Sequence, residues 1–187
     1  MRHSTPFPII TPNTLLLAHP SLLDPNFSKT VLFLTAHDEE HGSIAFVLNR
    51  PTHCTLGELL DADFRLSPLS HLPVFFGGPV ATQEIIFASF QQSPQSSKII
   101  AHFRLDIEEV LRASTDPSIT LRVFLGYSGW SSGQLAQEFT TDSWLISTPT
   151  PAIIQPIQSP TLWSEIVSTF GPWFKVMALA PDDPSKN

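Results

Sequence analysis

Short runs of apolar residues, each bounded by turn-forming residues, dominate the pattern along this chain. Three of them occupy residues 14–20, 30–37 and 42–50, and they are rich in leucine, β-branched and aromatic side chains. Continuous apolar runs of this length are typical of strands buried on both faces. The polar stretch DEEH separates the second run from the third. It predicts a hairpin, so we expect these two strands to pair in antiparallel fashion.

The same pattern predicts strands further along the chain, at residues 73–80, 84–90, 99–103, 118–127 and 143–147. A glycine and proline turn separates the first two of these, which predicts a second hairpin. The strands and short helices alternate without a regular βαβ period. We therefore expect a mixed α+β domain with mainly antiparallel pairing, and not a doubly wound parallel sheet.

Capping signals, more than long amphipathic periods, predict the helices. Capping boxes precede residues 55–60 (Thr55 with Glu58) and residues 107–114 (Asp106 with Glu109). Further helices are predicted at about residues 132–139 and 160–170, the second of them beginning at Ser159-Pro160 and ending at Gly171-Pro172. Residues 173–181 are expected to be extended or partly helical.

Proline usage suggests how the chain is divided. The 187 residues include 18 prolines, and several of these crowd the first 13 positions. We expect a proline-rich arm at residues 1–13, a single domain at residues 14–180 and a solvated tail at residues 181–187.

Charge and cysteine content narrow the classes of function. The net charge is -7, and the ten Lys and Arg residues are scattered without a run, which disfavours nucleic acid as a partner. The single cysteine, Cys54, excludes an intrachain disulfide and a cysteine-based zinc site. No stretch has the apolar length of a signal peptide core or a membrane span, so a cytoplasmic protein without a membrane partner is expected.

The most suggestive chemical motif is G-x-S-x-G at Gly129, Ser131 and Gly133. This spacing is typical of a nucleophile elbow, in which a serine lies on a tight strand-to-helix turn. Chain order in that architecture is Ser, then an acid, then His, yet all seven histidines precede Ser131. We therefore favour a turn followed by a helix capped by Ser131 with Gln134. Catalysis by Ser131 and an anion site at the helix start stay as alternatives.

Other polar clusters favour structural interpretations. His37 and His41 flank three acidic residues, but they are predicted to lie in a hairpin tip and not on a helix, so no metal is implied. Gly77-Gly78-Pro79 lacks the Lys and Ser/Thr of a phosphate loop and predicts a turn. Arg50 could hold an anion, although a role in tying backbone carbonyls together is favoured.

Three segments together resemble the YqgE/AlgH family of bacterial proteins. They are LLLAHPSLLDPNFSKTVLFLTAHDEEHGSIAFVLNRP, VFFGGPV and GYSGWSSGQLAQEFTTDSWL, in that order, within about residues 14–176. The matching positions are Asp24, Phe27, His37, Asn49, Pro51, Gly77, Gly78, Pro79, Gly126, Trp130, Gly133, Gln134, Leu135, Glu138, Trp144 and Leu145. The resemblance implies a bifurcated, partly barrel-like mixed sheet surrounded by short helices. It implies no established activity, although some members are labelled transcriptional regulators.

The leading hypothesis is a non-enzymatic, cytoplasmic binding or regulatory protein without a cofactor or metal. Its partner, a protein or a small molecule, and its oligomeric state are left open. The candidate ligand or partner surface comprises Asn49, Arg50, Gly77, Gly78, Pro79, Gly129, Trp130, Ser131 and Gln134. The alternatives are a serine hydrolase that uses Ser131 and a direct DNA-binding regulator.

Overall fold

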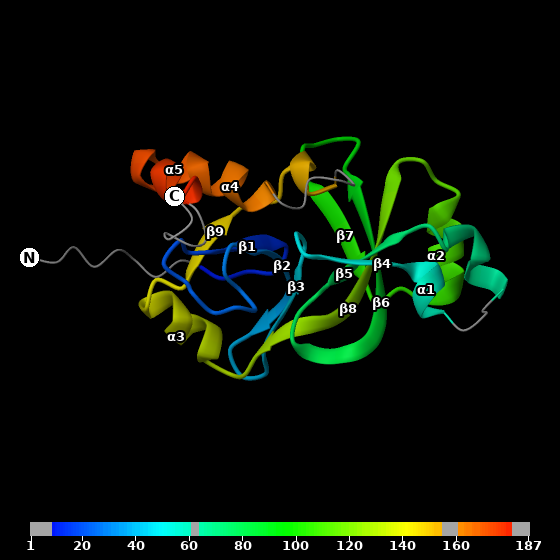
Figure 1. Ribbon diagram of the computed structural model, residues 1–187, viewed down its shortest axis with the longest axis horizontal. Coiled ribbons are helices and arrows are strands. Elements are labelled where there is room, and N and C mark those ends of the chain that lie inside the picture. Colours follow the sequence, from blue (N-terminus) through cyan, green and yellow to red (C-terminus); the bar gives the residue numbers. More distant parts are fainter. Residues whose placement is uncertain (1–8, 61–63, 155–160, 181–187) are drawn as a thin grey trace, which may run out of the picture.

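A computed structural model describes residues 9–60, 64–154 and 161–180 (Figure 1). The strands are β1 (Thr14–Ala18), β2 (Val31–Asp38), β3 (Gly42–Val47), β4 (Pro51–Thr55), β5 (Pro73–Phe76), β6 (Val80–Gln92), β7 (Ile99–Phe103), β8 (Ile119–Trp130) and β9 (Trp144–Ser147). The α-helices are α1 (Leu56–Leu59), α2 (Ile107–Ser114), α3 (Gln134–Thr140), α4 (Leu162–Val167) and α5 (Pro172–Ala178). Short 3₁₀ segments are η1 (Phe64–Leu69), η2 (Pro151–Ile154) and η3 (Ser168–Phe170).

Strand β8 joins the two arms of one mixed sheet. It pairs in parallel with β5, and it pairs in antiparallel fashion with β6 and, through its last residues, with β3. The strand order β4-β5-β8-β3-β2-β1-β9 runs through β8, while β6 and β7 branch from this path. The expected α+β fold, with a bifurcated mixed sheet and short helices, is thereby confirmed. The sheet is open, because its path does not close into a barrel.

One of the two predicted hairpins forms. β2 and β3 pair in antiparallel fashion as expected. The hairpin expected between residues 73–80 and 84–90 is wrong, because β5 pairs with β4 and β8 while β6 pairs with β7 and β8. β8, which comes about forty residues later in the chain, thus lies between β5 and β6. The turn chemistry between β5 and β6 marks a change of direction, but it does not specify a partner strand.

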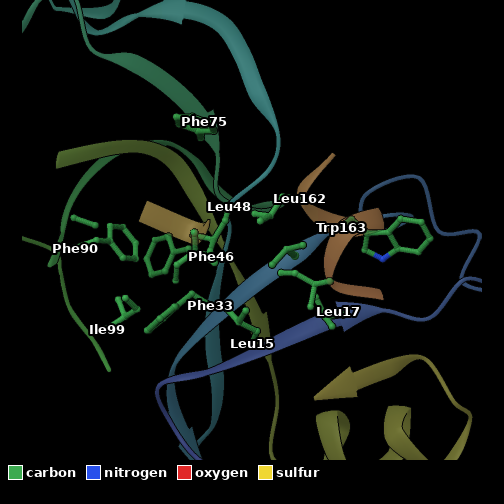
Figure 2. Packing of buried hydrophobic residues seen from close by; sticks show 14 of the residues in the cluster. Leu15, Leu17, Phe33, Phe46, Leu48, Phe75, Phe90, Ile99, Leu162 and Trp163 are labelled. Atoms are coloured by element: carbon green, nitrogen blue, oxygen red, sulfur yellow. The ribbon is translucent and has the colours of Figure 1, made fainter. Parts of the chain in front are cut away.

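The arm made of β1, β2, β3 and β9 is buried on both faces. Alternate residues of β1 belong to different apolar clusters: Leu15 and Leu17 pack in one, and Leu16 and Ala18 in the other. Figure 2 shows the first cluster, in which Leu17 lies near Trp163 of α4. The second cluster is covered by α3, which lies on the opposite side of this arm from α4 and α5 (Figure 1). The continuous apolar runs are explained by this two-sided burial.

The other arm has its own apolar cluster. Its buried members are Leu56, Leu66, Leu69, Val74, Phe87, Val110 and Val123, which connect α1, η1 and α2 to β5, β6 and β8. Two segments in this arm were not predicted. Residues 64–69 form a 3₁₀ turn, and β4 forms from a sequence that has no apolar run.

Both predicted capping boxes are confirmed. Glu109 N donates to Asp106 Oδ1 at 2.8 Å, and Asp106 N donates to Glu109 Oε2 at 2.8 Å. Thr55 N likewise donates to Glu58 Oε2 at 2.6 Å. These bonds satisfy backbone donors that the first helical turn would otherwise leave unpaired.

The other predicted helix starts have different outcomes. Ser131 is not the N-cap of α3: β8 continues to Trp130, and the helix begins after Gly133, whose φ is 73°. The start expected at Ser159-Pro160 lies outside the described residues. Its expected end is confirmed, since η3 reaches Phe170 and Gly171 has a φ of 137°. None of the helices in the described residues combines the length and apolar character needed to cross a membrane.

Arg122 of β8 is a buried cation that connects the two arms. Its guanidinium donates to Leu48 O at 3.2 Å and to Ile153 O at 2.6 Å. The same group lies over the rings of Phe75 and Phe90, at 5.2 and 5.6 Å from their centroids. Burial lowers the pKa of Arg122 to about 10, so the side chain remains charged at neutral pH. Its planar fork therefore connects β8 to η2 and to the residue that follows β3 within the core.

Helix α5 lies against the loop that follows β1. The His19 ring stacks on Trp173, with centroids 5.7 Å apart, and meets the edge of Phe174. Lys29 Nζ donates to Ala180 O at 3.0 Å beyond the end of the helix. Burial lowers the pKa of His19, while the negative charge of Asp142 acts in the opposite direction. The neutral imidazole is therefore the form that the folded state favours.

We predict that Arg122→Lys lowers the free energy of unfolding by about 2 kcal/mol. A single ammonium cannot reproduce the fork that reaches two carbonyls, and it lacks the flat face that lies over the phenylalanine rings. Urea denaturation followed by circular dichroism measures the change. Arg112→Lys, on the exposed side of α2, is the matched control and should change little. Equal stability of the two variants would contradict this structural role.

We also predict that acidification weakens the attachment of α5. A histidine whose folded pKa is lowered contributes stability that is present above its unfolded pKa of about 6.5 and is lost as the pH falls through the folded pKa. Unfolding free energy should therefore decrease between about pH 7.5 and about pH 5, and part of that decrease should vanish in His19→Gln. His53→Gln, at an exposed position, is the control. An unchanged pH dependence in His19→Gln would refute the prediction.

Candidate functional site

The Gly77-Gly78-Pro79 turn and the Gly126–Trp130 segment meet, as the sequence hypothesis requires. Gly77 N donates to Leu125 O at 2.8 Å, and Ser128 Oγ donates to Gly77 O at 3.2 Å. A Cβ at Gly77 would lie 2.2 Å from Gly126 O, so these backbones can approach only without side chains. The contact is made through buried backbone, and it fixes the sheet more than it forms an open surface.

The backbone of Arg50 lies beside the Gly77 turn, since Phe76 N donates to Arg50 O at 2.8 Å, but the side chains of Asn49 and Arg50 hold the loop that precedes β2. Asn49 Oδ1 accepts from Val31 N at 2.8 Å, and its Nδ2 donates to Lys29 O at 2.9 Å. Arg50 donates to Pro25 O at 2.8 Å and to Ser28 O at 3.0 Å. Burial lowers the pKa of Arg50, while Asp24 opposes the shift. Both side chains thus have the carbonyl-tying role that the sequence favours for Arg50.

Trp130 belongs to the core and not to the surface, because only 5% of it is exposed. Its indole Nε1 donates to Glu138 Oε2 at 2.9 Å, and Trp144 Nε1 donates to the same oxygen at 2.7 Å. Gln134 Nε2 donates to the other oxygen of Glu138 at 3.0 Å. Phe27 packs against both indole rings. One carboxylate therefore orients two tryptophans and fixes α3 to the sheet.

Ser131 is exposed and bonded to its own helix. Its Oγ and its backbone N both lie 3.1 Å from Gln134 Oε1, to which they donate. The positive φ of this turn belongs to Gly133, whereas a nucleophile elbow places its strain at the serine. Ser131 together with Gln134, Pro79 and Gly129 constitutes the exposed part of the predicted surface.

A cavity of about 580 Å³ opens beside Ser131. Its lining is mixed, with polar groups from the β2–β3 hairpin and the start of α3 next to apolar side chains: Ile9, Ile10, His37, Asp38, Glu39, Gly42, Ser43, Ser131, Gly133, Leu135 and Ala136. Ser132 Oγ donates to Glu39 O at 2.6 Å and so ties the two walls together. The site is therefore formed by the fold and held in place by short bonds.

His37 and Ser43 form a pair that sequence reasoning did not identify. They are opposite each other in the β2–β3 ladder, and His37 Nδ1 lies 2.8 Å from Ser43 Oγ. The sequence suggests His37 only together with His41, because the pairing with Ser43 depends on hairpin register. Register could have been a signal, since a correctly aligned hairpin places these two residues side by side.

Asp38 follows His37 in the chain, but its carboxylate accepts hydrogen bonds within the hairpin tip and not from His37. Asp38 Oδ1 accepts from Glu40 N, His41 N and His41 Nδ1, each at 2.8 Å. These bonds, led by the one from His41 N, lower the pKa of Asp38. HDEEH is thus a hairpin tip, as expected. Across residues 9–60, 64–154 and 161–180, no three His, Cys, Asp or Glu side chains gather in a way that could hold a metal ion.

A family model and the similar sequences both point to the same family. The family model described as AlgH-like (DUF179) matches residues 15–175. UPF0301 proteins of Burkholderia mallei and Burkholderia thailandensis are 35% identical to this chain over 153 residues, which are 76% of this chain and 79% of each relative.

Solved structures agree at the level of the fold. The solution structure of the AlgH protein of Pseudomonas aeruginosa has a TM-score of 0.63 and 27% identity, over 97% of this chain and 98% of that one. The crystal structure of protein DIP2367 of Corynebacterium diphtheriae has a TM-score of 0.73 and 16% identity, over 94% and 95% of the two chains. The second likeness concerns the fold alone.

We predict that Glu138→Ala lowers the free energy of unfolding by about 1–3 kcal/mol, because two indole N–H groups lose their acceptor. Urea denaturation monitored by tryptophan fluorescence should also report a changed environment of Trp130 and Trp144. Gln137→Ala, an exposed neighbour on α3, is the matched control and should stay within about 0.5 kcal/mol of the wild type. A Glu138→Ala protein as stable as this control would show that the network contributes little.

Proposed function

This chain belongs to the AlgH-like family, whose matched relatives have names without an assigned activity, and we propose that it is a non-enzymatic, cytoplasmic binding or regulatory protein. The observation that carries the proposal is the preformed cavity beside Ser131. Preformed concave sites with a few fixed polar groups are the usual place where small ligands or partner side chains bind.

Support comes from the roles of the polar residues around this cavity. Ser131 donates to Gln134, and Ser43 is paired with His37 while only 4% exposed. Asp38, which could have oriented His37, is occupied by the hairpin tip. A nucleophile requires a base within reach and a third group that orients the base. These side chains instead keep the cavity in shape and offer hydrogen-bond donors and acceptors to a bound polar group.

One observation favours an alternative, because His37 and Ser131 line the same cavity. A serine hydrolase that uses Ser131 would take its base from the β2–β3 hairpin, in the order His before Ser that some triads use. Direct DNA binding has weaker support, since the net charge is -7 and the basic residues are dispersed.

We predict that small polar fragments bind in the cavity and shift the amide signals of His37, Ser43 and Ser131 in a two-dimensional NMR screen. Ser131→Arg should abolish these shifts, because its longer side chain enters the cavity. Gln137→Arg adds the same charge at an exposed position of α3 outside the lining, and it should leave the shifts intact.

A fluorophosphonate probe separates the alternatives. Our proposal expects no labelling of the wild-type protein. Labelling that disappears in Ser131→Ala, but persists in Ser132→Ala, would establish the hydrolase instead. Duplex binding whose affinity falls steeply with salt would favour the DNA-binding alternative.

A further inference from the structure

Among the residues that the structure describes, strand β7 has one paired edge and one open edge. Within the described part of the chain, β7 pairs with β6 alone. The ladder continues past the strand end, where Ser93 N donates to Lys98 O at 2.8 Å. Backbone groups of an antiparallel strand alternate between its two edges. Because residue 98 bonds toward β6, the N–H and C=O groups of Ile99, Ala101 and Phe103 face the open edge.

Two cavities follow this open edge. The larger, of about 860 Å³, is lined by residues 96–102, Asn13, Thr148 and Pro149. The smaller, of about 370 Å³, has one wall from β7 and another from β2 and β3, including Thr35 and Phe46. Asn13, Ala101 and His102 line both, so the cavities form one groove along β7, which we call the β7 groove.

The charge of the β7 groove is opposite to that of the protein. Lys98 lines one end and Arg104 the other, with His102 between them, and none of the described Asp or Glu residues lines either cavity. Arg104 is 3.5 Å from Glu84, but both side chains are about half exposed, so this pair is weak. In a chain with a net charge of -7, this arrangement favours a ligand that carries carboxylates.

We propose that the β7 groove binds an extended acidic segment of a partner protein as an added β-strand. Backbone groups at the open edge supply main-chain hydrogen bonds, and alternate side-chain positions supply specificity. A second copy of β7 is a poor occupant, because it would bring the same cationic side chains into the groove.

The two faces of β7 define the sequence that fits. Ile100 and His102 are exposed on one face, whereas Ile99, Ala101 and Phe103 are turned toward the interior, and Arg104 is exposed just after the strand ends. An added strand aligned with them places alternate residues on the same two faces. Acidic residues should therefore alternate with small or medium apolar residues. This inference does not rest on the cavity beside Ser131, since the two sites share no residue.

The test uses a fluorescein-labelled peptide of about seven residues in which Glu and Val alternate. Fluorescence anisotropy with the full chain should show binding of this peptide. A peptide of the same composition with the Glu residues grouped together, and one with Lys in place of Glu, should bind at least about tenfold more weakly.

Variants of β7 separate main-chain recognition from charge attraction. Ala101→Pro removes an N–H from the open edge without touching the ladder to β6, and it should weaken binding at least about tenfold. Ala101→Ser keeps the N–H and is the matched control. Lys98→Glu combined with His102→Glu should weaken binding about tenfold, whereas Lys175→Glu on α5 should not.

Hydrogen exchange supplies an independent readout. Bound peptide should protect the amides of Ile99, Ala101 and Phe103, while those of Ile100 and His102, already paired with β6, should change little. Absence of binding at millimolar peptide, full binding by Ala101→Pro or equal binding of the Lys peptide would each overturn the proposal. Ser131→Arg should bind the peptide normally, so this proposal and the one for the cavity beside Ser131 can fail separately.

Discussion

The structure depends on one strand that serves both arms of the sheet. β8 pairs with β5, β6 and β3. Three neighbours can gather around one strand only if their backbones pass very close to one another. A Cβ at Gly78 would lie 2.3 Å from Ser128 Oγ, and Gly126 has a φ of 66°. Glycine at these positions therefore allows the bifurcation. One apolar cluster is shared by both arms, and each arm has one further cluster of its own.

Many of the residues that carry the family resemblance make hydrogen bonds that fix the sheet and the elements packed next to it. Glu138 joins Trp130 and Trp144, while Asn49 fixes the entry to β2. Such buried polar bonds need particular side chains in particular places, which is why they give a sequence a recognisable signature. The two binding sites that we propose lie beside them, in a cavity next to Ser131 and in the β7 groove. The motif that suggested a nucleophile contributes Ser131 and Gly133 to the lining of the cavity, whereas it contributes nothing to the β7 groove.

The sequence predicted local features well because their causes are local. The capping box of Asp106 with Glu109 lies within one helical turn, and the run 30–37 forms a strand because both of its faces are apolar. Predictions that required a partner strand failed more often. β5 and β6 follow each other across a turn, yet β8 lies between them. The exact start of α3 also differed, because β8 continues to Trp130.

By itself, the sequence determined the mixed α+β class, the strands of the buried arm and the family, because composition, periodicity and the order of motifs can be read directly along the chain. Only the tertiary structure decided how β8 pairs with β3, β5 and β6, that Trp130 is buried, that His37 faces Ser43 and that β7 pairs with β6 alone among the described residues. These features depend on register and on contacts between residues far apart in the chain. Such contacts are selected by the joint packing of all the elements, and no single stretch of sequence contains that information.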